Sequence, residues 1–293
     1  MPWVRGGRAK GSWWDLPPWP PRTAFLASAV APVVVGTGVT AHFRLVPAGQ
    51  ALGALGVAVG LAVALHGLGS SPRVGLPTGR RVPGWPARGQ VPAVAAAGLA
   101  VATGLGIWLA ATTAWWLLAV GATAVAAALV LGRPSLPQRP ARGELLAALA
   151  MAELLAGWGT VWVELGRLPV LGMVAAFLPA SLATALLILV KLRDLATSPV
   201  AERLSPVAGL SERAARTLFH GLLVLALVVP LLITVPGLDG AECFLPWLLA
   251  PLGEGPLRNS SSADPSRQGH AVRQTALLLV ASSALLAVGV WAG

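Results

Sequence analysis

The feature that most constrains this chain is a series of long apolar runs, each close to the length that crosses a bilayer. A helix of roughly 20 apolar residues spans the hydrocarbon core, and the runs are continuous in Ala, Leu, Val and Gly, without the polar alternation of membrane β-strands. We therefore predict an all-α, polytopic membrane helical bundle with about nine transmembrane helices. The predicted spans are Ala24–Phe43, Gln50–Gly69, Val91–Ala111, Trp115–Gly132, Leu145–Val163, Pro169–Val190, Thr217–Val235, Leu238–Gly253 and Gln274–Ala292.

Composition excludes a soluble fold. Charged residues make up 11% of the chain, against about 25% in soluble domains, and the mean hydropathy is +0.74. This is too little polar material to cover a water-facing surface. The eighth span is the weakest, because it is short and contains Glu242, Pro246 and Pro251.

The basic residues predict the orientation. If the nine spans alternate, every Lys and Arg except Arg44 and Arg167 falls on one side of the membrane. Basic flanks remain cytoplasmic, so we expect a multi-pass protein of the cell membrane with a cytoplasmic N-terminus and an external C-terminus. Residues 1–22 would form a cytoplasmic arm and residues 23–293 the membrane domain. The net charge of +10 is then a topology and lipid-contact signal, and we expect no nucleic-acid partner.

Four short stretches occur in an order that suggests a known family. They are Pro-Arg-Thr at 21–23 with the small-residue run 27–38, Gly-Glu-Leu at 143–145 followed by Gly-Thr at 159–160, Leu-Arg-Asp-Leu-Ala-Thr at 192–197, and Arg-Thr-Leu-Phe-His-Gly-Leu-Leu at 216–223. Together they resemble the UbiA family of membrane prenyltransferases, in particular its menaquinone branch, the 1,4-dihydroxy-2-naphthoate polyprenyltransferases.

The resemblance implies a bundle around a cavity that opens to the cytoplasm and to lipid. It also implies two Asp-rich motifs, at the ends of the second and sixth helices, that hold Mg²⁺ and through it a polyprenyl diphosphate. The family transfers the prenyl chain to an aromatic acceptor in quinone biosynthesis. This chemistry needs carboxylates for the metal and positive charge for the departing diphosphate.

The first motif departs from the family pattern. His66 stands where the family has Asn, Ser70 where it has the first Asp, and Arg73 lies near the second Asp. A shifted alignment does not restore the motif, because no Asp or Glu occurs between Leu16 and Gly143.

The second motif is half retained. Arg193 and Asp194 match the family, but Lys191 replaces an Asn and Ser198 replaces the second Asp. Asp194 is thus the residual candidate for a catalytic carboxylate and for a weak Mg²⁺ ligand; alternatively it contacts a nearby arginine. Cations surround these positions, which makes Arg73, Lys191, Arg193 and Arg203 candidates for direct diphosphate binding.

Further candidates are polar residues inside predicted helices. Glu153 lies near the middle of the fifth span, where an ionisable residue is costly unless it faces a cavity or a partner. Glu153 therefore either faces the cavity, makes an interhelical hydrogen bond, or reflects a misplaced helix boundary. His66, Ser70 and Ser198 are the other cavity candidates, with an interhelical hydrogen bond as the alternative for His66.

Two functional hypotheses follow. In one, the protein is an isoprenoid-handling prenyltransferase homologue with an altered diphosphate site and weak or lost Mg²⁺-dependent activity. In the other, it is a non-catalytic membrane protein that binds an isoprenoid, a lipid or a partner protein. A transporter is disfavoured, because no internal repeat is visible.

Overall fold

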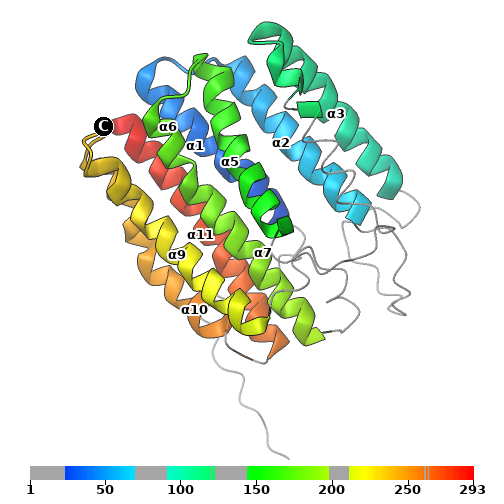
Figure 1. The fold of residues 1–293 in the computed structure, drawn as a ribbon, viewed down its shortest axis with the longest axis vertical. Coiled ribbons are helices and arrows are strands. Elements are labelled where there is room, and N and C mark those ends of the chain that lie inside the picture. Colours follow the sequence, from blue (N-terminus) through cyan, green and yellow to red (C-terminus); the bar gives the residue numbers. More distant parts are fainter. Residues whose placement is uncertain are drawn as a thin grey trace, which may run out of the picture.

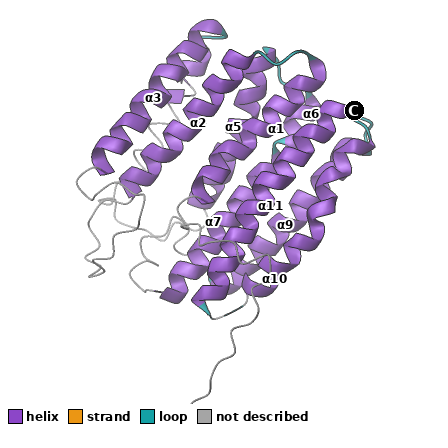
Figure 2. Ribbon diagram, turned by 180° about the vertical axis from the view of Figure 1, so that it is seen from behind, coloured by secondary structure: helices purple, strands orange, loops and turns teal. Residues whose placement is uncertain are grey.

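A computed structural model describes residues 24–69, 91–119, 121–122, 144–197, 211–260, 262 and 264–293 (Figure 1). Its elements are α1 (Ala24–Phe43), α2 (Ala48–Gly69), α3 (Val91–Thr112), α5 (Glu144–Leu165), α6 (Val170–Ala175), α7 (Phe177–Thr197), α9 (Glu212–Thr234), the 3₁₀-helix η2 (Ala241–Gly253), α10 (Glu254–Ser260) and α11 (Pro265–Ala292). The described residues contain no strand (Figure 2), and the prediction of an all-α membrane bundle is confirmed.

Five stretches in the described chain are long and apolar enough to cross a bilayer. They lie in α1, α3, the consecutive helices α6 and α7, α9 and α11. The helix α5 is as long as these but contains Glu144, Glu153 and Glu164, so its apolar character is interrupted. The N-terminal arm, the loops at 70–90 and 198–210, and most of the fourth predicted span lie outside the described residues.

The bundle is organised around α7. This helix packs against both α9 and α11, while α1 packs on α11 and α5, and α2 pairs mainly with α3 at one side (Figure 1). Most of α7 is buried, and Leu178, Leu182, Leu186 and Leu189 join the main core. From Phe177 to Val190 the helix has no charged residue, which suits this central position.

Glycine allows the closest helix crossings. A Cβ placed on Gly60 of α2 would lie 2.7 Å from the carbonyl oxygen of Gly98 on α3, and the converse distance is the same. A Cβ on Gly38 of α1 would lie 2.5 Å from the Cα of Ala287 on α11. Helices in lipid associate through such close packing of small residues.

Two helices begin earlier than the sequence predicted. The helix α9 starts at Glu212, where the Ser211 side chain accepts a 3.2 Å hydrogen bond from the Ala214 backbone N–H. The helix α11 starts at Pro265, after Asp264 accepts a 2.9 Å bond from the Ser266 N–H. Four basic residues that precede the predicted seventh and ninth spans therefore lie within these helices: Arg213, Arg216, Arg267 and Arg273.

The eighth predicted span was wrong in type and in extent. Instead of an α-helix over Leu238–Gly253, the chain forms a 3₁₀-helix, η2, that continues into α10 and ends at Ser260. Pro246 and Pro251 lack the N–H groups that α-helical bonding requires. A 3₁₀-helix rises about 2.0 Å per residue, so this conformation lets a short segment cover more of the bundle's length.

The two ends of the bundle differ in charge. The described helices α1, α3, α5, α9 and α11 start at one end, which we call the basic end, and the C-terminus lies at the other (Figure 1). Arg44 and Arg167 lie at the C-terminal end, and the remaining described arginines at the basic end.

Candidate functional site

The structure places the last turn of α2 and the last turns of α7 at the basic end. Arg193 is half-buried on α7 and its backbone, like those of Lys191 and Asp194, is helical. The side chains of His66, Lys191 and Asp194 lie outside the described part of the structure. Four further predicted site residues are outside it entirely: Ser70, Arg73, Ser198 and Arg203.

The carboxylates of this chain do not fit a magnesium clamp between α2 and α7. The stretch from 16 to 143, which includes all of α2 and α3, has no Asp or Glu. Among the described residues no group of three or more His, Cys, Asp or Glu side chains could hold a metal. Two acidic residues at the basic end have other roles, because Glu212 pairs with Arg216 at 2.5 Å and Asp264 caps α11. In the sequence of α7, Asp194 is the one acidic residue.

Glu153 is an interhelical hydrogen-bonding residue. Its carboxyl group is hydrogen-bonded by the side chain of Ser28 on α1, and it retains some accessible surface although it lies deep among the helices. Glu153 therefore has an interhelical partner, and the cavity-facing role stays a prediction.

Glu153 is also remote from the end of α7. Its neighbour Leu154 packs in a cluster with Ala180, near the start of that helix. Arg193 lies thirteen residues further along α7, which corresponds to roughly 20 Å at about 1.5 Å per residue. A small ligand at Arg193 therefore does not reach Glu153.

A second buried carboxylate, Glu164, was missed by the sequence analysis because the fifth span was predicted to end at Val163. The side chain is completely buried and accepts a 2.8 Å hydrogen bond from the Thr37 hydroxyl of α1. Its second oxygen, Oε2, has no partner among the described residues. The spacing from Glu153 could have revealed Glu164 in the sequence. Eleven residues make about three helical turns, so both glutamates lie on one face of the helix.

Glu153 and Glu164 lie on either side of a tight contact between α1 and α5. Between them, a Cβ on Gly36 would lie 2.8 Å from the Thr160 Cβ and 3.0 Å from the Gly157 carbonyl oxygen. At Gly36 the two helices are in direct contact, and the Ser28–Glu153 and Thr37–Glu164 pairs lie on either side of this contact. Each glutamate therefore serves as a separate anchor between α1 and α5.

These features define a class: a polytopic α-helical membrane protein in which helix termini and most of the described arginines gather at one end. Comparison with known proteins is more specific, although no family model matches the chain. The 1,4-dihydroxy-2-naphthoate octaprenyltransferase of Mycobacterium tuberculosis (strain ATCC 25618 / H37Rv) is 30% identical over 307 aligned positions, covering 99% of this chain and 94% of that protein. The protein of the same name from Mycobacterium leprae (strain TN) is 30% identical over 244 positions, covering 80% of this chain and 77% of its own length.

The chain therefore belongs to the UbiA family of membrane prenyltransferases, and its similarity is to the menaquinone branch.

Proposed function

We propose that this protein binds a polyprenyl diphosphate at the basic end without Mg²⁺, and that its Mg²⁺-dependent prenyl transfer to a dihydroxynaphthoate-type acceptor is weak or absent. The binding groups would be Arg73, Lys191, Arg193 and Arg203. Family membership supports the ligand class, and the altered motif residues support the metal-free mode. We also infer that the basic end faces the cytoplasm.

The observation that carries this proposal is the absence of acidic residues from 16 to 143. Mg²⁺ prefers oxygen ligands, usually one or two carboxylates together with substrate phosphates and water. The whole of α2 lies in this acid-free stretch, so a metal ion would have carboxylate support from the α7 side alone. Asp194 could contribute one such ligand.

Arginine can replace the charge of a metal but not its chemistry. A guanidinium donates paired hydrogen bonds that match phosphate oxygens. It does not supply the Lewis-acid assistance with which a metal stabilises the departing group. Arginines and a lysine beside the former carboxylate positions are thus expected to retain binding, while transfer slows.

Binding is tested by titrating farnesyl diphosphate into purified protein in detergent with EDTA present. We expect saturable, EDTA-insensitive binding that weakens about tenfold or more, equivalent to about 1.4 kcal/mol, in Arg73→Ala and in Arg193→Ala. Arg167→Ala is the matched control, because Arg167 lies at the opposite end with its guanidinium 5.4 Å from the centre of the Phe43 ring. Binding that appears only with Mg²⁺ would refute the proposal.

Transfer is tested separately with a polyprenyl diphosphate and 1,4-dihydroxy-2-naphthoate, with and without Mg²⁺. We expect little turnover in either condition. Turnover within about tenfold of the M. tuberculosis relative, or about 1.4 kcal/mol in the barrier, would show that the residual motif supports catalysis. Binding without turnover would instead favour the non-catalytic isoprenoid-binding role.

A further inference from the structure

Glu164 is a buried carboxyl group at the C-terminal end of the bundle. It lies in the last turn of α5, one residue beyond the predicted fifth span, and it is 0% exposed. The last turns of α1 supply two hydroxyl groups to it, those of Thr37 and Thr40. An ionised carboxylate in such a place is costly unless hydrogen bonds or a counter-ion compensate for the lost water. The partners of Glu164 therefore determine which form of the carboxyl group is favoured.

The hydroxyl groups around Glu164 provide only one donor hydrogen. A threonine hydroxyl has a single hydrogen and two lone pairs. Thr37 donates its hydrogen to Oε1 of Glu164 at 2.8 Å, whereas Thr40 donates its hydrogen to the Gly36 carbonyl oxygen at 3.1 Å. The Thr40 hydroxyl also interacts with the carboxyl group, and it can present only lone pairs in that direction. Oε2 of Glu164 receives no hydrogen bond from the described residues.

This arrangement suits a protonated carboxyl group. On a carboxylate, Oε2 would be a buried charged acceptor without a donor, and Thr40 would present lone pairs to it. On a carboxylic acid, the O–H group can donate to the Thr40 oxygen, while Oε1 keeps its bond from Thr37. The neutral form therefore satisfies both oxygens, and the charged form satisfies one.

The ionisable groups nearby do not replace the proton. From α1, Arg44 acts on Glu164 through its charge and not through a hydrogen bond, and its side chain is exposed to solvent. His42 instead shares a 2.9 Å hydrogen bond with a carbonyl oxygen of α11, and Arg167 lies 5.4 Å from the centre of an aromatic ring of α1. The other helices that pack on α5, which are α2, α6 and α7, have no ionisable side chain at this end.

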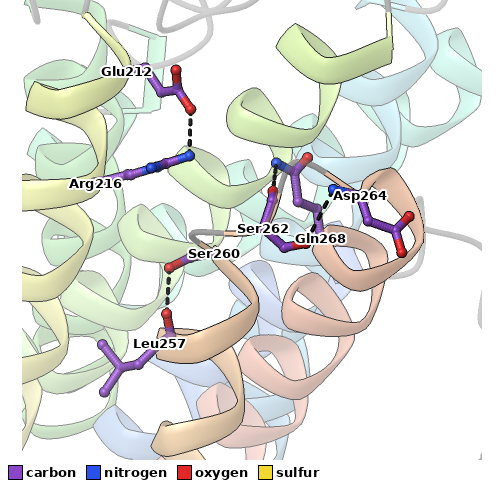
Figure 3. Close-up of polar contacts among 7 residues, drawn as sticks. All are labelled: Glu212, Arg216, Leu257, Ser260, Ser262, Asp264 and Gln268. Atoms are coloured by element: carbon purple, nitrogen blue, oxygen red, sulfur yellow. Dashed lines mark hydrogen bonds and ion pairs between the residues drawn. The ribbon is translucent and has the colours of Figure 1, made fainter.

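Acidic residues at the basic end have a different environment, and Figure 3 shows two of them, Glu212 and Asp264. Glu212 forms an ion pair with Arg216, and Asp264 accepts a hydrogen bond from the Ser266 N–H. Their side chains are 62% and 51% exposed, so water also stabilises their charge. Glu164, by contrast, is buried and forms no ion pair with the described residues.

We propose that Glu164 is held as a neutral carboxylic acid, and that release of its proton to water weakens the contact between the C-terminal ends of α1 and α5. This end of the bundle would then be a proton-sensitive latch. The latch uses no residue assigned above to the prenyl diphosphate, and it does not depend on that proposal.

The sign of the pH dependence follows from proton linkage. A glutamate in the unfolded chain ionises at about pH 4.3, whereas the folded protein keeps this proton to higher pH. Above that pH the folded state therefore binds more protons than the unfolded state, and its stability falls as the pH rises.

The protonation state is measured by infrared spectroscopy of the purified full-length protein, from the carbonyl stretch of a protonated carboxyl group. We expect a band at neutral pH that is lost in Glu164→Gln and that disappears as the pH rises. Thr40→Val removes the acceptor of the acid and should lower the midpoint of this titration by about half a pH unit or more. Thr37→Val removes a donor that favours the carboxylate and should raise the midpoint. Glu153→Gln is the matched control, because this glutamate is hydrogen-bonded by Ser28 instead, and it should leave the midpoint unchanged.

The latch itself is measured by thermal unfolding, followed by circular dichroism from mildly acidic to mildly alkaline pH. The unaltered protein should lose stability relative to Glu164→Gln as the pH rises, because glutamine has a similar size and cannot ionise. An unchanged acid band in Glu164→Gln would show that Glu164 is ionised, and a raised midpoint in Thr40→Val would show that Thr40 donates to a carboxylate. Parallel unfolding profiles of the unaltered protein and Glu164→Gln would show that the proton does not control the contact. Each of these three results would overturn the proposal.

Discussion

The contact between α1 and α11 gives a quantitative prediction for Gly38→Ala. A Cβ at this position would lie 2.5 Å from both the Cα and the Cβ of Ala287, and 2.8 Å from its carbonyl oxygen. Carbon atoms pack best at roughly 3.5–4.0 Å, so the helices must separate by about 1 Å. The obstacle is backbone, and side-chain rotation cannot relieve it.

The expected cost follows from two opposing effects. Overpacking typically destabilises by about 1–3 kcal/mol, while replacing a helical glycine with alanine contributes up to about 1 kcal/mol in the other direction. Because the close contact is with backbone atoms, the upper part of the overpacking range applies, about 2–3 kcal/mol, and the net loss is about 1–2 kcal/mol. At about 2–4 °C per kcal/mol for a chain approaching this size, we expect Tm to fall by about 2–8 °C.

The assay uses the single cysteine as a reporter of unfolding. Cys243 is completely buried in η2, and η2 packs on α11, so a thiol-reactive fluorophore should label it when these helices separate. Gly104→Ala on α3 is the matched control, because its Cβ meets nothing within 4 Å, and its Tm should stay the same or rise slightly. If Gly38→Ala unfolds at the same temperature as Gly104→Ala or above it, the close approach of α1 and α11 is incorrect.

Two further predictions concern the buried glutamate and the topology. Thr37→Val removes the hydroxyl that donates to Glu164 at 2.8 Å, and should destabilise the protein by about 1–3 kcal/mol in the same thiol assay. The control Thr112→Val removes a hydroxyl that donates to a backbone carbonyl at an exposed position, and it should cost less. Equal losses of stability in the two variants would contradict a special role for the buried Thr37–Glu164 pair. Reporter fusions at Gly79 and Gly293 should report opposite sides of the membrane, because the basic loops are expected to stay cytoplasmic; identical readings would rule out the nine-span topology.

The sequence by itself determined the class of the protein and much of its architecture. Apolar runs of bilayer length leave few stable options, because in lipid the backbone must satisfy its own hydrogen bonds. Most predicted spans coincide with helices, and α1 matches its predicted bounds of Ala24 and Phe43. The ordered landmarks also indicated the UbiA family, which the two mycobacterial relatives confirm.

Where a helix begins, and whether it is an α-helix or a 3₁₀-helix, depends on local interactions that do not appear in a hydropathy profile. The helix α11 begins at Pro265 because Asp264 caps it, so a polar first section precedes the apolar one. In η2, Pro246 and Pro251 interrupt α-helical bonding, but apolar composition alone cannot distinguish a 3₁₀-helix from an α-helix.

Only the tertiary structure decided which polar residues meet. The face shared by Glu153 and Glu164 was readable from helical periodicity, but their partners Ser28 and Thr37 lie on a helix more than a hundred residues earlier. Likewise, the sequence does not show that Gln268 Oε1 is buried without a donor among the described residues. Hydropathy reports how a segment partitions between water and lipid, whereas helix packing determines which side chains are brought together and which atoms are left without a partner.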